Sequence, residues 1–157
     1  MEKNQLQLFA DSNLSETKNI NICEKYDPKE SIIFCNEDVF NVIKEIPDRS
    51  VKLIITSPPY NIGKEYENST NLTDYLNLQE KLIEELVRIL QEDGSLCWQV
   101  GNYVKKGELF PLDLYFYPIF KYKFNLKLRN RIIWYFGHGL HTSKRFSGRY
   151  ETVLWFT

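Results

Sequence analysis

The sequence has no long apolar run and few cysteines, and both shortages restrict what the protein can be. It contains no window of about 18 uninterrupted apolar residues, so no segment is expected to span a membrane. The polar start has no apolar stretch of signal-peptide length, and we expect a cytoplasmic protein. Cys23, Cys35 and Cys97 show no Cys-x-x-Cys spacing and have no nearby histidine. This argues against zinc and against a disulfide framework, and no metal is predicted.

Acidic side chains are nearly absent from the C-terminal third. The segment from Lys121 to Glu151 has eight cations and one carboxylate, although the net charge of the whole chain is −1. The cations are Lys121, Lys123, Lys127, Arg129, Arg131, Lys144, Arg145 and Arg149. Aromatic residues lie between them, a combination that suits a phosphate backbone and exposed bases. A solvated, charged strand face is the alternative explanation.

Alternating strand and helix patterns predict an α/β fold. Residues 1–29 are polar without a sustained period and are expected to form a flexible arm, while residues 30–157 form the folded portion. Strands are expected at 31–35, 51–56, 95–100, 126–136 and 150–156, and helices at 38–46, 73–91 and 112–122. Thr73 is the expected N-cap of the second helix. The three tryptophans, Trp98, Trp134 and Trp155, are expected in the core.

The run Thr56-Ser57-Pro58-Pro59-Tyr60 directly follows a strand pattern rich in β-branched residues. Two prolines fix φ and donate no backbone N–H, so they make a stiff loop whose carbonyls accept hydrogen bonds. Ser57 adds a hydroxyl and Tyr60 adds a flat ring. Such a corner can hold a planar base that carries an amino group, although an ordinary strand-to-loop turn is the alternative.

The sequence around this corner resembles the DNA amino-methyltransferases of bacterial restriction–modification systems. The resemblance extends over about residues 31–157 and rests on Glu37-Asp38, Leu53 to Tyr66, Glu92 to Leu96, Arg131 to Trp134 and Arg145 to Thr157. The order of these segments is similar to the permuted, β-type arrangement of that family. The resemblance implies a partial Rossmann-like sheet with flanking helices. It also implies methyl transfer from S-adenosyl-L-methionine (SAM) to cytosine N4 or adenine N6 of double-stranded DNA.

The resemblance also implies roles for individual residues. The catalytic group is Ser57, Pro58, Pro59 and Tyr60. The Ser57 hydroxyl and the Pro58 carbonyl would accept the amino hydrogens of the base, and Tyr60 would stack on the base after it is flipped from the helix. Asp38 would contact the adenine or ribose of the cofactor, with a helix N-cap as the alternative. Asn61 is a weaker cofactor candidate.

The DNA-contacting candidates lie near the last two strands. Tyr150 and Arg149 begin the final strand, where the family walls the base pocket, and Glu151 is expected to pair with a basic neighbour. The preceding loop supplies His138, His141, Lys144 and Arg145. Two histidines three residues apart can suggest a metal, but no Cys, Asp or Glu accompanies them, so DNA contact is preferred. Tyr135 to Gly139 imitates the cofactor loop of the family, but no helix pattern follows it.

The glycine-rich loop that grips the methionine part of SAM in the family has no counterpart in this sequence. We therefore expect residues 30–157 to be an incomplete catalytic portion that lacks the central cofactor-loop strand. A complementary chain carrying that loop is the expected partner, and residues 53–55 are expected to form an exposed apolar sheet edge.

Ser at position 57 favours cytosine N4 as the target, with adenine N6 as the close alternative. A non-catalytic homologue that binds DNA or a partner, and an RNA or protein-glutamine methyltransferase, are the remaining alternatives.

Overall fold

The computed structural model describes residues 22–23, 25–30, 32–61, 71–138, 142–143 and 145–157. The chain divides after Asp38 into two units, and each is described by itself. In the first unit, β1 (Ile22–Cys23) pairs in parallel with β2 (Ile32–Ile33). The strand expected at 31–35 is therefore present but short. The pairing joins residues on both sides of the boundary that was expected at residue 29.

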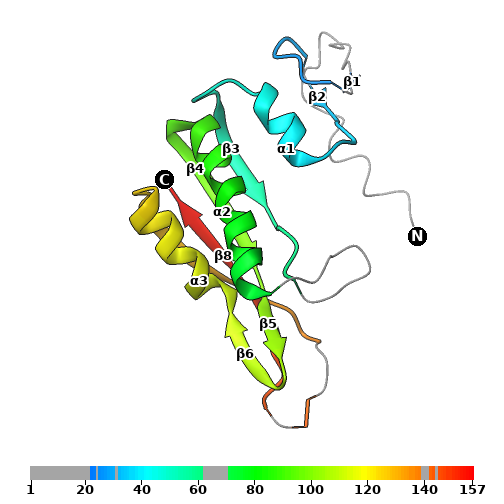
Figure 1. Ribbon diagram of the computed structural model, residues 1–157, viewed down its shortest axis with the longest axis vertical. Coiled ribbons are helices and arrows are strands. Elements are labelled where there is room, and N and C mark those ends of the chain that lie inside the picture. The colour runs from blue at the N-terminus through cyan, green and yellow to red at the C-terminus, as the bar shows by residue number, and fades with distance from the viewer. Residues whose placement is uncertain (1–21, 24, 31, 62–70, 139–141, 144) are drawn as a thin grey trace, which may run out of the picture. The chain divides into compact units, whose positions relative to one another are not determined.

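The second unit, residues 39–157, is a mixed α/β structure (Figure 1). Its elements are α1 (Val39–Val42), a 3-10 helix (Ile43–Glu45), β3 (Val51–Thr56), α2 (Leu72–Ile89), β4 (Leu90–Val100), β5 (Asn102–Lys105), β6 (Glu108–Pro111), α3 (Leu112–Pro118), a π-helix (Ile119–Lys123), β7 (Leu128–Tyr135) and β8 (Tyr150–Phe156). The main sheet has the order β3-β4-β8-β7. The pair β3–β4 is parallel and the other two pairs are antiparallel. The predicted α/β class is confirmed.

Helix α2 begins one residue earlier than the sequence suggested. Its N-cap is Asn71, whose side chain accepts a hydrogen bond of 2.9 Å from the backbone N–H of Asp74. Thr73, the expected cap, therefore lies inside the helix. Asn71, two residues earlier, caps the helix instead by accepting from a backbone N–H of the first turn that has no partner within the helix. The helix ends at Ile89, and Leu90 is already extended. Strand β4 starts at Leu90, whereas the sequence predicted that the helix would run to about residue 91 and be terminated by Asp93-Gly94.

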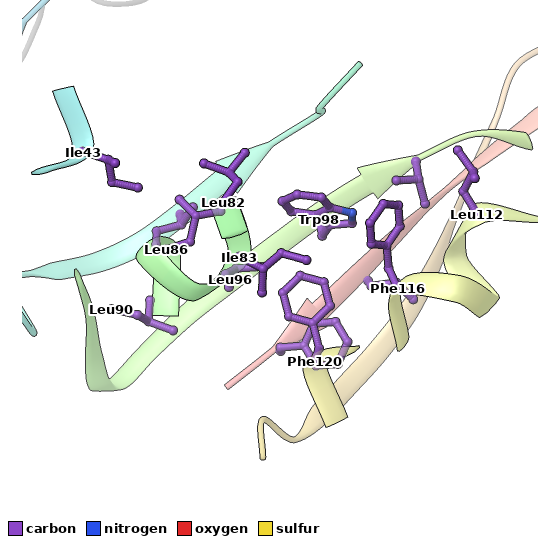
Figure 2. Packing of buried hydrophobic residues seen from close by; sticks show 14 of the residues in the cluster. Ile43, Leu82, Ile83, Leu86, Leu90, Leu96, Trp98, Leu112, Phe116 and Phe120 are labelled. Carbon is purple, nitrogen blue, oxygen red and sulfur yellow. The ribbon is translucent and has the colours of Figure 1, made fainter. Parts of the chain in front are cut away.

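One face of the main sheet packs against α2, α3 and the π-helix. Figure 2 shows Trp98 of β4 facing Phe116 and Phe120, and all three side chains are fully buried. The ring centroids of Trp98 lie 5.2 Å from Phe116 and 5.5 Å from Phe120, in edge-to-face geometry. Such pairs add about 0.5–1.5 kcal/mol beyond the burial of their area. This cluster fixes β4 against α3 and the π-helix.

The opposite face of the sheet is exposed in the described residues. Alternation along the strands places Leu53, Ile55 and Trp155 on this face, and they are 54%, 72% and 36% exposed. The core position expected for Trp155 is therefore wrong. Trp134 of β7 is 59% exposed, so its expected place in the core is also wrong. The reason is that β7 is an edge strand, and only one side chain along it, Leu128, is even partly buried.

The hairpin β5–β6 was not anticipated from the sequence. It lies beyond the carboxyl end of β4 in Figure 1 and turns at Lys106-Gly107, where φ is 51° and 86°. Two consecutive positive φ angles are typical of the tight turns that close hairpins. Among the described residues, no helix is both long and apolar enough to cross a membrane.

Candidate active site

Four strand ends meet at one end of the main sheet. The carboxyl ends of the parallel strands β3 and β4 lie there together with the start of β8 and the end of β7, because β8 runs antiparallel to both of its neighbours. A cavity of about 600 Å³ opens at this end. Its lining comprises Tyr60, Gly101, Asn102, Val104, Leu109, Phe136, His138, Thr142, Arg145, Gly148, Tyr150 and Glu151.

The diproline corner directly follows β3. Ser57 and Pro59 are exposed, while Pro58 is buried. The carbonyl of Pro59 accepts a hydrogen bond of 2.8 Å from the hydroxyl of Tyr75, so the corner is tied to helix α2. The sequence predicted the carbonyl of Pro58 as an acceptor for the base, whereas the carbonyl that Tyr75 binds is that of the next residue, Pro59. Because the prolines fix φ and Tyr75 holds the loop, the Ser57 hydroxyl is presented from a stiff backbone.

Tyr60 is anchored at both its hydroxyl and its ring. The hydroxyl lies 2.9 Å from Ser57 Oγ and donates to Glu151 Oε2 at 3.0 Å. The ring lies over Gly101, where an added Cβ would approach Tyr60 Cε2 to 3.1 Å and Cδ2 to 3.2 Å. A side chain at this position would therefore require the Tyr60 ring to shift by a few tenths of an ångström.

Glu151 is the acceptor that organises this site. Its Oε2 accepts hydrogen bonds from Tyr60 and, at 2.7 Å, from Gln99 Nε2. The basic neighbour that the sequence suggested for Glu151 is not its partner among the described residues. Glu151 is partly buried, and the Tyr60 phenol and the Gln99 amide supply hydrogen bonds that its carboxylate would otherwise make with water.

The environment of Tyr60 disfavours its ionised form. Burial, the largest cause, together with the hydrogen bond and negative charge of Glu151, raises the pKa of Tyr60 to about 12. Hydrogen bonds from Ser57 and Gln99 act in the opposite direction. The phenol therefore keeps its proton at neutral pH and remains a donor to Glu151.

The structure brings three of the predicted DNA-contacting residues to the cavity. His138, Arg145 and Tyr150 line it, and Tyr150 is 39% exposed. Arg149 is exposed but outside the lining, and its carbonyl accepts from the backbone N–H of Phe136 at 2.9 Å. His141 and Lys144 lie outside the described residues.

The basic C-terminal stretch does not act as one surface. Arg131 forms an ion pair of 2.6 Å with Asp113, which is 3% exposed. Lys123 pairs with Glu80 on α2. These two cations hold elements of the fold together, whereas Arg145 faces the cavity. The ion pairs of Arg131 and Lys123 are thus a third explanation for part of the charge pattern, and DNA contact by Arg145 stays a prediction.

The two cofactor candidates belong to different units. Asp38 closes the first unit and directly precedes α1, a place that suits the N-cap alternative. Asn61 belongs to the second unit, is 4% exposed and has φ of 59°, a left-handed conformation that Asn tolerates better than most residues. Within the described part of the chain, no cluster of His, Cys, Asp and Glu could hold a metal ion.

The sequence did not reveal several residues of the site. Gln99 was read only as part of a buried strand, although alternation along β4 places it on the face opposite Trp98. Gly101 carried no signal beyond marking the end of the strand. Val104 and Leu109 of the hairpin also line the cavity, and the Lys106-Gly107 turn could have indicated that hairpin.

Comparison with known proteins gives a consistent result. A family model for N6/N4 DNA methylases matches residues 51–157. Type II methyltransferase M.BglII of Bacillus subtilis is 49% identical over 123 residues, which cover 78% of this chain and 34% of that protein. The chain thus spans about a third of the length of this curated relative.

Solved structures share the fold. The cytosine-N4-specific PvuII DNA methyltransferase superposes with a TM-score of 0.66 at 20% identity, covering 77% of this chain and 47% of that one. A protein of Thermus thermophilus, provisionally named a DNA modification methylase and solved with SAM, gives a TM-score of 0.59 at 25% identity. That match covers 74% of this chain and 51% of the other.

Proposed function

The chain belongs to the N6/N4 DNA methylase family, and from this premise we propose that it is the catalytic portion of a SAM-dependent DNA methyltransferase. The proposed reaction transfers a methyl group to an exocyclic amino group of a base, with cytosine N4 favoured. The observation that carries this proposal is the hydrogen bond between Ser57, which lies outside the cavity lining, and the anchored Tyr60, which lines a cavity of about 600 Å³.

The reaction needs help because the amino nitrogen of a base is a poor nucleophile, with its lone pair delocalised into the ring. An acceptor that binds an amino hydrogen favours a pyramidal nitrogen and exposes that lone pair. Ser57 Oγ is the proposed acceptor, with the Pro58 carbonyl as the second. The gain comes from holding the nitrogen in line with the methyl group, and orientation of this kind can supply several kcal/mol of the barrier.

The base would enter the cavity after flipping out of the duplex. Tyr60 and Tyr150 offer aromatic surfaces for stacking, and Arg145 and His138, which line the same cavity, are the proposed DNA contacts. SAM, when bound, supplies the electrophilic sulfonium methyl group. Asn61 and Asp38 are the proposed contacts of this chain with SAM.

A direct assay of the product tests this function. The chain, mixed with a family segment that contains the glycine-rich loop, is incubated with methyl-labelled SAM and duplex DNA, and the nucleosides are separated to identify N4-methylcytosine or N6-methyladenine. Ser57→Ala and Tyr60→Ala should each abolish most of the product. Ser50→Ala, whose hydroxyl bonds to the Pro47 carbonyl away from the cavity, is the matched control. N6-methyladenine would move the assignment to the alternative target, and unchanged turnover in both site variants would refute the proposal.

The partner proposal is a second polypeptide that supplies the glycine-rich cofactor loop. It is supported by the outer edge of β3, which has no strand partner among the described residues, and by exposed Leu53 and Ile55. Exposed apolar edges of this kind favour pairing with another chain. Expressing this chain with and without a family segment that contains the loop tests the idea. Methylation by this chain alone contradicts the need for a partner, while DNA binding without methylation in both preparations supports the non-catalytic alternative.

A further inference from the structure

Three side chains at the site form hydrogen bonds with a defined direction. Glu151 Oε2 lies 3.0 Å from Tyr60 Oη, and Tyr60 Oη lies 2.9 Å from Ser57 Oγ. An ionised carboxylate only accepts hydrogen bonds, and each hydroxyl has one proton. Tyr60 therefore gives its proton to Glu151, and the bond between Tyr60 and Ser57 must use the proton of Ser57.

This direction determines what Ser57 can offer to a third group. Its only proton is engaged with Tyr60, so its oxygen presents lone pairs alone to a bound ligand. Gln99 donates to the same oxygen of Glu151 at 2.7 Å, which holds the carboxylate toward Tyr60. The three-residue series from Glu151 through Tyr60 to Ser57 is called the acceptor relay below.

We propose that Glu151 is a positioning residue that makes Ser57 an obligate hydrogen-bond acceptor, so that the site selects an amino group over a carbonyl oxygen on the base. This inference rests on the proposed function, because it requires a base near Ser57. An amino group donates to Ser57. The carbonyl oxygen that replaces the amino group in uracil or hypoxanthine can only accept, and it meets lone pairs.

Replacing Glu151 by Gln keeps the shape of the side chain but removes the fixed direction. A glutamine amide can donate to Tyr60 Oη, and Tyr60 can then turn its proton toward Ser57. The Ser57 proton becomes free to donate to a carbonyl oxygen. Discrimination between amino and carbonyl bases should therefore relax in Glu151→Gln, although the ring of Tyr60 remains available for stacking.

The test is a ratio of dissociation constants measured with the full 157-residue chain. The probes are fluorescein-labelled duplexes with one cytosine or one uracil opposite an abasic site, which makes flipping easy. A second pair carries adenine or hypoxanthine. The loss of one hydrogen bond to Ser57 predicts a ratio of about 10-fold in the unmodified chain. In Glu151→Gln the ratio should approach one, while Glu92→Gln, a remote exposed carboxylate, should leave it unchanged.

A double-mutant cycle separates the relay from a general structural role. Tyr60→Phe keeps the ring but removes the hydroxyl that links the other two residues. The double variant Tyr60→Phe/Glu151→Gln should then show the same ratio as Tyr60→Phe alone, since both changes interrupt one pathway. A purely structural effect of Glu151 would lower the affinity for both bases together and leave their ratio intact. Thermal unfolding of each variant verifies the fold.

The outcomes distinguish the two proposals. If the unmodified chain binds none of the duplexes, the proposed function fails and the relay fails with it. If the chain binds DNA without discriminating amino from carbonyl bases, or if Glu151→Gln keeps the full ratio, the acceptor relay is overturned while the proposed function stands.

Discussion

The ring of Tyr60 lies so close to Gly101 that a Cβ at that position would approach two ring carbons to 3.1 and 3.2 Å. These distances are below ordinary van der Waals separation, and the Tyr60 hydroxyl is held by Ser57 and Glu151. A shift of the ring by a few tenths of an ångström would therefore strain those hydrogen bonds. The end of β4 and the diproline corner of β3 depend on each other at this contact.

Gly101→Ala should displace the Tyr60 ring and lower methyl transfer by about 10-fold, because small displacements of oriented groups are costly in catalysis. Gly137→Ala is the matched control, since nothing lies within 4 Å of a Cβ added there. Transfer rates and thermal unfolding should be measured for both variants. Equal rates for Gly101→Ala and the unmodified chain would show that the position of the ring is unimportant.

Tyr60 should make the stability of the fold depend on alkaline pH. Its pKa is raised from 10.0 to about 12, so between these values the unfolded chain loses this proton while the folded chain retains it. The stabilising contribution is complete below pH 10 and declines as the pH rises toward 12. Urea unfolding across this range should show a smaller decline for Tyr60→Phe than for the unmodified chain. Parallel curves would contradict the assignment.

The ion pair of Arg131 with Asp113 should contribute more to stability than the exposed pairs do. Asp113 is 3% exposed and receives Arg131 Nε at 2.7 Å, so Arg131→Met would leave a buried carboxylate without this partner. We expect a loss of about 2 kcal/mol in the free energy of unfolding. Arg49→Met, which breaks an exposed pair with Glu92, should cost less than about 1 kcal/mol. Chemical denaturation measures both, and equal losses would assign no special role to Asp113.

Arg145 should contribute an electrostatic contact with DNA. It is exposed at the cavity, so Arg145→Gln should weaken binding and reduce the salt slope by about 0.9 if one phosphate contact is lost. Lys81→Gln, an exposed change on helix α2, provides the control. Fluorescence anisotropy over a series of salt concentrations gives both slopes. An unchanged slope in Arg145→Gln would remove this residue from the DNA interface.

Local patterns in the sequence were sufficient for much of this protein. The β-branched run before Ser57 predicted strand β3, and the period of apolar residues predicted α2, because these signals depend only on neighbours along the chain. The resemblance over about residues 31–157 identified the family for the same reason, and the family model matches residues 51–157. The tertiary structure decided which strand became an edge, and so it exposed Trp134 where the sequence indicated a core residue. It also decided that Glu151, 91 residues beyond Tyr60, is the acceptor of the Tyr60 proton. Contacts of that separation arise from the order of strands in the sheet, which no local pattern encodes.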